Sequence, residues 1–283
     1  MQTSFLTRMR ANFLRHAALR LNVWSARILV RGLGALGSER SPAGDSVIQY
    51  YLDHRKEQLL GLMAGDGDTT ARQTAFGQEG EDLILTRLVA GMGPCYYVDI
   101  GAHHPFRFSN TYLLHKAGWK GINVDATPGL IEVFRTHRPG DANLEMLIGE
   151  GGDERVLHLF NEPAVNTVSS ETMETRDLSG TDYREIGTVT RKTVPLRDVL
   201  EGHLPKDAVF GVLSVDVEGE ELGVLRSNDW SRFRPKFILV EQQMTADLYA
   251  CLQHEITRLL QSVGYVPIAK AYNTVFFRSE DRG

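Results

Sequence analysis

Two apolar runs that each reach an acidic residue constrain the fold of this chain more than any other feature. The first, residues 96–100, contains Asp99 and is followed by Gly101, and glycine lets the backbone turn sharply. The second run ends at Asp125, 26 residues after Asp99. Buried parallel strands have this form where they end at a ligand crevice. A carboxylate at the end of the second strand is well placed to accept hydrogen bonds from ribose hydroxyls.

Strands and helices alternate along most of the chain, which predicts a parallel sheet with right-handed crossovers and helices on both faces. The predicted helices are 83–89, 105–118, 127–137, 220–227 and 246–262, and the strands after the first two are 144–148, 208–217, 236–241, 265–269 and 274–278. Ligands bind beyond the carboxyl ends of such strands. The acids at four of those ends are therefore expected to face one crevice: Asp99, Asp125, Asp216 and Glu241.

Residues 150–195 interrupt the alternation. Residues 156–160 and 189–194 have the composition of strands, whereas residues 161–187 are polar and lack periodicity. A long polar segment inside an α/β domain is often a lid or an acceptor-binding insertion. The alternative is a disordered surface loop.

The N-terminal segment, residues 1–36, has helical spacing and is basic. Its apolar stripe consists of Leu6, Met9, Phe13, Ala17, Leu21, Trp24 and Ile28. This pattern is typical of a helix on an anionic membrane surface, of a helix packed on its own protein or a partner, and of a mitochondrial transit peptide. A glycine- and serine-rich linker follows, so we expect an extension over residues 1–70 and the main domain over residues 71–283.

Charge and cysteine content narrow the function. Six arginines and no acids precede Glu39, and without them the formal net charge of −5 becomes −11. A domain this acidic is a poor partner for nucleic acid. Cys95 and Cys251 form neither a disulfide framework nor a metal-ligand spacing, so a cytoplasmic location without a metal is expected, with membrane association through the first helix left open. No apolar run is long enough to span a bilayer.

The turn after the first strand lacks a phosphate cradle. Residues 101–104 are Gly-Ala-His-His, without the G-x-G-x-x-G fingerprint, and no P-loop occurs in the chain. A pyrophosphate-bearing dinucleotide needs those backbone amides. A nucleoside cofactor without phosphates, such as S-adenosylmethionine, needs a carboxylate for its ribose, and acidic groups suit its sulfonium cation.

A set of ordered stretches resembles the FkbM-type family of S-adenosylmethionine-dependent methyltransferases. The matching stretches are 77–85, 97–103, 118–125, 213–219, 236–241 and 273–276, within residues 72–278. The resemblance implies a Rossmann-like class I methyltransferase sheet and O-methylation of a hydroxyl on a sugar, glycan or natural product. His103 departs from the family pattern, which has asparagine there.

The residues that we expect to act fall into two groups. Asp216 and Glu218 are candidates for the catalytic base or for orienting the acceptor hydroxyl, and His104 is a rival base because histidine titrates near neutral pH. The expected cofactor-binding residues are Gln78, Asp99, Gly101, Ala102, His103, Asn110, Asp125 and Ala126.

Two other functions are compatible with the same sequence. A nicotinamide-dependent oxidoreductase uses a similar sheet, although the missing third glycine argues against it. A non-catalytic, membrane-associated binding module is the other alternative.

Overall fold

The structure is a computed structural model that describes residues 74–176, 178–242 and 247–280. The chain divides into residues 1–73 and residues 74–283, and the description that follows concerns the second unit. The predicted N-terminal extension, with its membrane or partner contact, lies outside the described residues.

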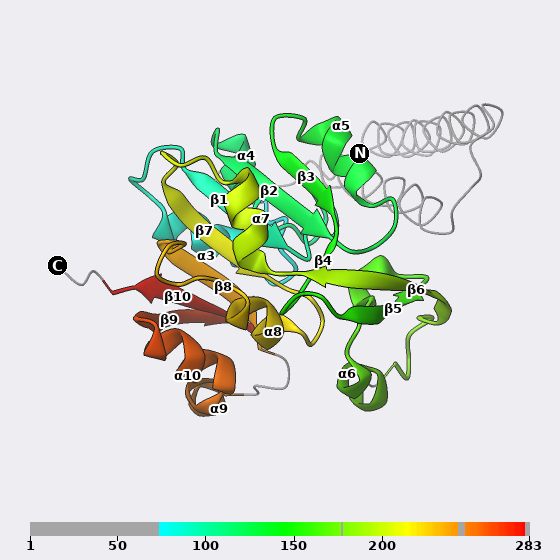
Figure 1. Cartoon of the computed structure of the whole chain (residues 1–283). Coiled ribbons are helices and arrows are strands. Elements are labelled where there is room, and N and C mark those ends of the chain that lie inside the picture. Colours follow the sequence, from blue (N-terminus) through cyan, green and yellow to red (C-terminus); the bar gives the residue numbers. More distant parts are fainter. Residues whose placement is uncertain (1–73, 177, 243–246, 281–283) are drawn as a thin grey trace, which may run out of the picture. The chain divides into compact units, whose positions relative to one another are not determined.

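The centre of the second unit is a seven-stranded sheet in the order β3-β2-β1-β7-β8-β10-β9 (Figure 1). Neighbouring strands are parallel, except that β10 runs antiparallel to both β8 and β9. The strands are β1 (Tyr96–Ile100), β2 (Lys120–Asp125), β3 (Ala142–Glu145), β7 (Phe210–Val215), β8 (Phe237–Glu241), β9 (Tyr265–Ala271) and β10 (Thr274–Ser279). The predicted Rossmann-like α/β class is confirmed.

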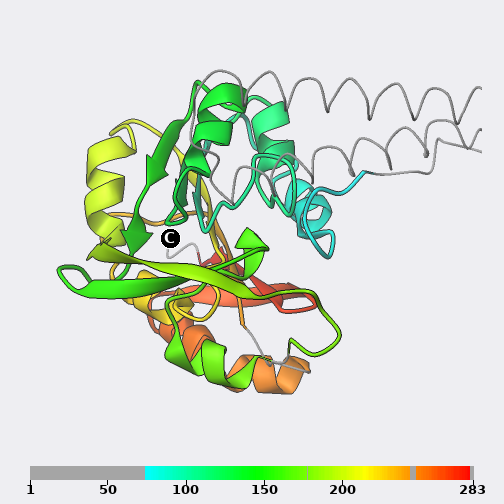
Figure 2. The same ribbon diagram turned by 90° about the vertical axis from the view of Figure 1, so that its right-hand side faces the viewer.

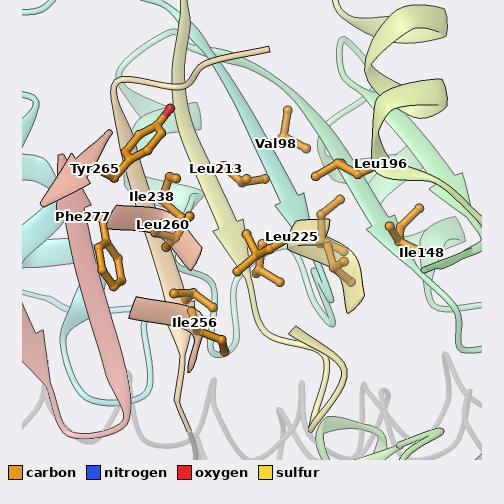
Figure 3. Packing of buried hydrophobic residues seen from close by; sticks show 14 of the residues in the cluster. Val98, Ile148, Leu196, Leu213, Leu225, Ile238, Ile256, Leu260, Tyr265 and Phe277 are labelled. Atoms are coloured by element: carbon orange, nitrogen blue, oxygen red, sulfur yellow. The ribbon is translucent and has the colours of Figure 1, made fainter. Parts of the chain in front are cut away.

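Helices cover both faces of this sheet, because successive side chains of a strand point to opposite faces. One face packs on α7 (Leu196–His203), α8 (Glu221–Arg226) and α10 (Glu255–Ser262). Figure 3 shows strand residues of this core, such as Val98 and Leu213, beside Leu196 and Leu225. The opposite face, which includes Tyr97, packs on α3 (Glu81–Leu88) and α4 (Tyr112–Lys116). Helix α5 (Ile131–His137) follows β2 and packs on Ala102.

The first crossover helix is shorter than predicted. The expectation of a helix over residues 105–118 is wrong for its first half, since only α4 is helical. The preceding residues wrap around the buried guanidinium of Arg138, which donates hydrogen bonds to the Pro105 carbonyl (2.5 Å) and to Ser109 Oγ (2.9 Å). A cation that arrives from another part of the chain leaves no trace in the local spacing.

The predicted third strand is two strands in two sheets. Residues 142–145 form β3 in the main sheet, whereas β4 (Leu147–Ile148) pairs in parallel with β6 (Glu185–Val194) of a small sheet. Helix α7, directly after β6, was not predicted.

The predicted long helix over residues 246–262 is two helices, α9 (Leu248–Gln253) and α10. His254 separates them with an extended backbone, and its Nδ1 accepts the backbone N–H of Ile256 at the start of α10. Capping by this side chain favours a new helix start over a continuous helix.

The interruption at residues 150–195 supplies two strands of a small sheet in the order β4-β6-β5, where β5 is Glu154–Phe160. The predicted strands at 156–160 and 189–194 are confirmed as parts of the β5–β6 hairpin, which extends past the carboxyl ends of the main strands (Figures 1 and 2). The polar stretch between them holds a 3-10 helix, η2 (Pro163–Val165), and α6 (Ser170–Thr175). We call residues 161–176 the roof segment.

No helix among the described residues is long and apolar enough to cross a membrane.

Candidate functional site

A cavity lies between the carboxyl ends of the main strands and the roof segment. It encloses about 590 Å³ of empty space, including the part open to solvent, which is within the range of small-molecule sites. Its lining combines apolar side chains with polar and acidic groups. The apolar lining includes Met146, Leu147, Ile148, Leu157, Pro163, Ala164 and Val168, and the polar lining includes His103, Asp125, Thr127, Asn166, Asp216, Glu218 and Glu220.

Asp125 ends β2 at the floor of this cavity. One carboxylate oxygen accepts the backbone N–H of His103 (2.9 Å) and the other accepts that of Thr127 (2.8 Å). Burial raises the pKa of Asp125, and these backbone donors oppose the shift. Each carboxylate oxygen has a second lone pair, so Asp125 retains the capacity to accept hydrogen bonds from two hydroxyls.

Gly101 and Asp216 meet where β1 and β7 end side by side. The backbone N–H of Asp216 donates to the Ile100 carbonyl (2.9 Å), and a Cβ on Gly101 would lie 1.7 Å from the Asp216 carbonyl oxygen. Gly101 also has a φ of 81°, in the left-handed region that favours glycine. The glycine therefore allows the two strand ends to approach each other at the cavity.

Not all residues expected at the cofactor line this cavity. Asp99 points to the α4 face of the sheet, where it accepts a hydrogen bond from Thr111 Oγ1 (2.7 Å). Ala102 is buried against α5, and Asn110 is buried with its amide 3.4 Å from Ser214 Oγ. Gln78 is exposed before α3. Gly101, His103, Asp125 and Ala126 do line the cavity.

A buried arginine organises the loop between β1 and α4. Arg138 has no exposed surface, and besides Pro105 and Ser109 its guanidinium donates to Tyr97 Oη, Thr111 Oγ1 and Asn123 Oδ1. Burial raises the pKa of Asp99, and the hydrogen bond from Thr111 and the positive charge of Arg138 oppose this shift. These hydrogen bonds let Arg138 hold the loop between β1 and α4 in place.

The two histidines belong to this same loop. Nδ1 of His104 accepts the backbone N–H groups of Phe106 and Arg107, both at 3.1 Å. Nε2 of His103 lies 3.2 Å from Arg107 Nη1. Burial lowers the pKa of each histidine to about 3, so both imidazoles are neutral at physiological pH. His104 is engaged as a loop cap, whereas His103 faces the cavity.

Asp216 belongs to a cluster of three carboxylates. Oxygen atoms of Asp216, Glu221 and Glu241 all lie within 4.8 Å of one another. Burial, and then the charge of Glu241, raises the pKa of Glu221 from 4.5 to about 7. Burial and the charges of Glu241, Glu218, Glu221 and Asp99 raise the pKa of Asp216 well above its ordinary value. Such a group can share protons, attract a cation or accept a proton from a substrate.

Glu218 is held by the roof segment. Its carboxylate accepts a hydrogen bond from Arg176 (2.5 Å), and its carbonyl oxygen accepts from the hydroxyls of Thr167 (2.7 Å) and Thr172 (3.2 Å). Its φ of 57° is in the left-handed region. Glu218 therefore lines the cavity as one member of an ion pair.

A comparison with protein families identifies the chain at this point. The family described as "Methyltransferase FkbM domain" matches residues 99–267, which contain Asp125, Asp216 and the roof segment. The chain belongs to the FkbM methyltransferase family. A comparison with curated proteins found no match.

Solved structures similar to this FkbM-family chain include two methyltransferases. A precorrin-6y C5,15-methyltransferase from Geobacter metallireducens is 10% identical, with a TM-score of 0.36, over 75% of this chain and 95% of that one. An O-methyltransferase from Bacillus cereus, solved in complex with SAH, is 11% identical, with a TM-score of 0.34, over 87% of this chain and 93% of that one.

S-adenosylmethionine is the cofactor of this FkbM-family methyltransferase, and the residues at the cavity fit it. Asp125 can accept the ribose hydroxyls, the apolar part of the lining suits a base, and Gly101 allows close approach of the backbone. The nearby carboxylates suit a sulfonium cation. Family membership decides against the nicotinamide-dependent oxidoreductase alternative.

Reasoning from the sequence missed residues that shape the FkbM-family site. Arg138 directly followed the predicted helix 127–137, and no motif contained Arg107, Glu162, Asn166 or Arg176. The polar composition of residues 161–187 indicated a special segment, but no local pattern pairs those residues with loops elsewhere in the chain.

Proposed function

We propose that this protein is an S-adenosylmethionine-dependent O-methyltransferase that acts on a hydroxyl of a sugar, glycan or natural product, with Asp216 as the general base. One observation carries the proposal. Asp216 lines the cofactor cavity and also belongs to the carboxylate cluster with Glu221 and Glu241. An acceptor hydroxyl at Asp216 would stand between the cofactor and groups able to receive its proton.

The chemistry needs positioning and proton removal. S-adenosylmethionine supplies a methyl group that its sulfonium already activates. Asp216 would accept the proton of the acceptor hydroxyl as the acceptor oxygen took the methyl group and S-adenosylhomocysteine left. Burial and neighbouring negative charges raise the pKa of Asp216, which brings it toward the range suited to a base at neutral pH.

Glu218 and His104 are less suited to this role. Glu218 is already engaged in an ion pair with Arg176. His104 uses its Nδ1 to cap the loop, and its lowered pKa makes it a weak base.

The first test is isothermal titration with S-adenosylmethionine, S-adenosylhomocysteine and NAD. We expect both sulfur compounds to bind and NAD not to bind. Failure to bind either sulfur compound would overturn the proposed function. The second test is a labelled-methyl screen against glycan, lipid and small-molecule fractions, with the methylated atom identified by NMR. Transfer to nitrogen or carbon alone would reject O-methylation, and absence of transfer would favour a non-catalytic binding module.

The role of Asp216 is tested by Asp216→Asn with the acceptor that the screen finds. We expect affinity for S-adenosylhomocysteine to stay within about threefold while turnover falls about 100-fold or more, as for removal of a general base. Asp207→Asn, at an exposed aspartate before β7, is the matched control and should keep full turnover. Equal turnover in Asp216→Asn and the control would remove Asp216 from the mechanism.

A further inference from the structure

The roof segment is fastened to three different strand-end loops of the main sheet. Glu162 receives two hydrogen bonds from Arg107, in the loop after β1 (2.5 and 2.6 Å). Asn166 Nδ2 donates to Thr127 Oγ1, after β2 (3.0 Å). Thr167, Thr172 and Arg176 all hold Glu218, after β7. The segment therefore joins the same loops that form the floor of the cavity.

The roof segment also lines the cavity directly. Pro163, Ala164, Asn166, Thr167 and Val168 face the space that the carboxyl ends of the main strands enclose from the other side. The contacts that fasten the roof segment therefore set how closely it covers a bound cofactor.

Among these contacts, Arg176 makes hydrogen bonds both within the roof segment and to the loop after β7. One guanidinium nitrogen donates to the Val165 carbonyl within the roof segment, and another donates to the Glu218 carboxylate, both at 2.5 Å. The side chains are 15% and 23% exposed, so the ion pair is partly shielded from water. The planar fork of arginine bridges two acceptors at once, which a lysine ammonium does less well.

We propose that Arg176 is a positioning residue of the methyl-transfer site, whose guanidinium holds the roof segment closed over the cofactor and fixes Glu218 beside Asp216. This inference rests on the proposed function, because it concerns the same cavity and the same base. Arg176 acts through Glu218 and the roof segment.

The charge of Arg176 should also affect the pH at which the carboxylate cluster ionises. The groups that raise the pKa of Asp216 through their charge come from β8 (Glu241), from the turn and helix after β7 (Glu218 and Glu221) and from β1 (Asp99). Arg176 pairs with one of them. Without this cation, Glu218 would add more negative potential at Asp216, and the carboxylate cluster would ionise at a higher pH.

The experiment measures binding rather than turnover. S-adenosylmethionine carries a sulfonium charge that S-adenosylhomocysteine lacks, so the ratio of their affinities reports the charge of the carboxylate cluster. We would measure this ratio from pH 5.5 to 9 and the dissociation rate of S-adenosylhomocysteine by stopped flow. The variants are Arg176→Gln, Arg176→Lys and Glu162→Gln. Arg232→Gln is the control, because Arg232 forms an exposed ion pair with Glu201 outside the cavity.

The variants should separate the effect on the dissociation rate from the effect on the pH midpoint of the affinity ratio. Arg176→Gln should speed dissociation about tenfold, as expected for loss of a charged hydrogen bond, and should move the midpoint of the affinity ratio to higher pH. Arg176→Lys should restore the midpoint but only part of the slow dissociation. Glu162→Gln should speed dissociation and leave the midpoint unchanged, and Arg232→Gln should change neither.

Circular dichroism and thermal melting would establish that each variant is folded, and if Arg176→Gln fails to fold, Arg176→Lys decides. The inference would be overturned if the folded Arg176 variant released S-adenosylhomocysteine at the wild-type rate and kept the wild-type midpoint of the affinity ratio. The proposed function would then remain intact. A wild-type protein that binds neither sulfur compound would overturn the proposed function and this inference with it.

Discussion

The carbonyl oxygen of Asp216 occupies the position that a side chain on Gly101 would need. A Cβ there would lie 1.7 Å from that oxygen, and Gly101 has a φ of 81°. Gly80 has the same φ, but a Cβ on Gly80 would meet no other atom within 4 Å. The two glycines therefore separate backbone strain from steric exclusion.

We predict that Gly80→Ala costs about 1–2 kcal/mol of unfolding free energy, the cost of a left-handed alanine. Gly101→Ala should cost more than about 4 kcal/mol, because the Asp216 backbone must also move. Urea unfolding of both variants measures the difference, and similar losses would show that the close approach has little energetic weight. Loss of S-adenosylhomocysteine binding should accompany Gly101→Ala alone.

Glu221 should make the protein less stable as the pH rises. Its pKa in the folded protein is about 7, above its ordinary value of 4.5. An acid whose folded pKa is raised contributes stability that is fully present below pH 4.5 and is lost as the pH rises through about 7. We expect a loss of up to about 3 kcal/mol between pH 4.5 and pH 8 from this group.

The variant Glu221→Gln should remove this slope, because the amide does not titrate and its oxygen can still accept the backbone N–H groups of Val217 and Gly219. Urea unfolding at pH 5 and pH 8 measures the effect. Glu255→Gln, at an exposed glutamate of α10, is the control. A pH slope in Glu221→Gln as steep as that of the control would contradict the prediction.

Asp125 should be needed for cofactor affinity. In Asp125→Asn one oxygen becomes an NH₂ group, which can accept neither a ribose hydroxyl nor its present backbone N–H. We expect at least a tenfold weaker affinity for S-adenosylhomocysteine and a loss of about 1–3 kcal/mol of stability. Isothermal titration and urea unfolding measure both. Asp153→Asn, at an exposed aspartate, should leave affinity unchanged, and unchanged affinity in Asp125→Asn would remove its ribose role.

The carboxylate cluster should favour the charged cofactor increasingly as the pH rises. The raised pKa values of Asp216 and Glu221 imply that the cluster gains negative charge as the pH rises through about 7. We predict that the affinity for S-adenosylmethionine, relative to S-adenosylhomocysteine, rises several-fold between pH 6 and pH 8. Asp216→Asn should flatten this dependence. A ratio that is independent of pH in the wild type would place the sulfonium away from the cluster.

The N-terminal segment should direct the protein to anionic membranes. The basic, amphipathic pattern of residues 1–36 predicts binding that weakens with salt. We expect the full chain to float with vesicles that contain phosphatidylserine and a chain without residues 1–38 to remain in the soluble fraction. Equal partitioning of the two would favour a packing role for this segment.

The sequence was sufficient to predict the features whose cause is local. The apolar runs that end at Asp125 and Glu241 predicted their strands, because a buried parallel strand needs continuous apolar residues. The runs at 121–125 and 208–217 also predicted that Asp125 and Asp216 lie at one crevice. Asp99 differs because the two-residue period of the strand turns it toward α4, although it stands only one residue before the strand end.

The features that the sequence did not predict depend on distant partners. The buried guanidinium of Arg138 replaces half a helix by a loop, and His254 divides one helix into two. The roof segment is held by Arg107 and Glu218, which are remote from it in the chain. Charge pairing between remote segments leaves no periodicity for a local pattern to reveal.

The parallel pair β4–β6 has a consequence for how such a protein can diversify. Leu147 pairs with Thr193 and Ile148 with Val194, so the chain leaves for the roof segment and returns from it at adjacent positions. Neighbouring strands are only about 5 Å apart. The residues between those two points therefore form a cassette with closely spaced ends. It can be shortened, lengthened or exchanged while the main sheet keeps its register.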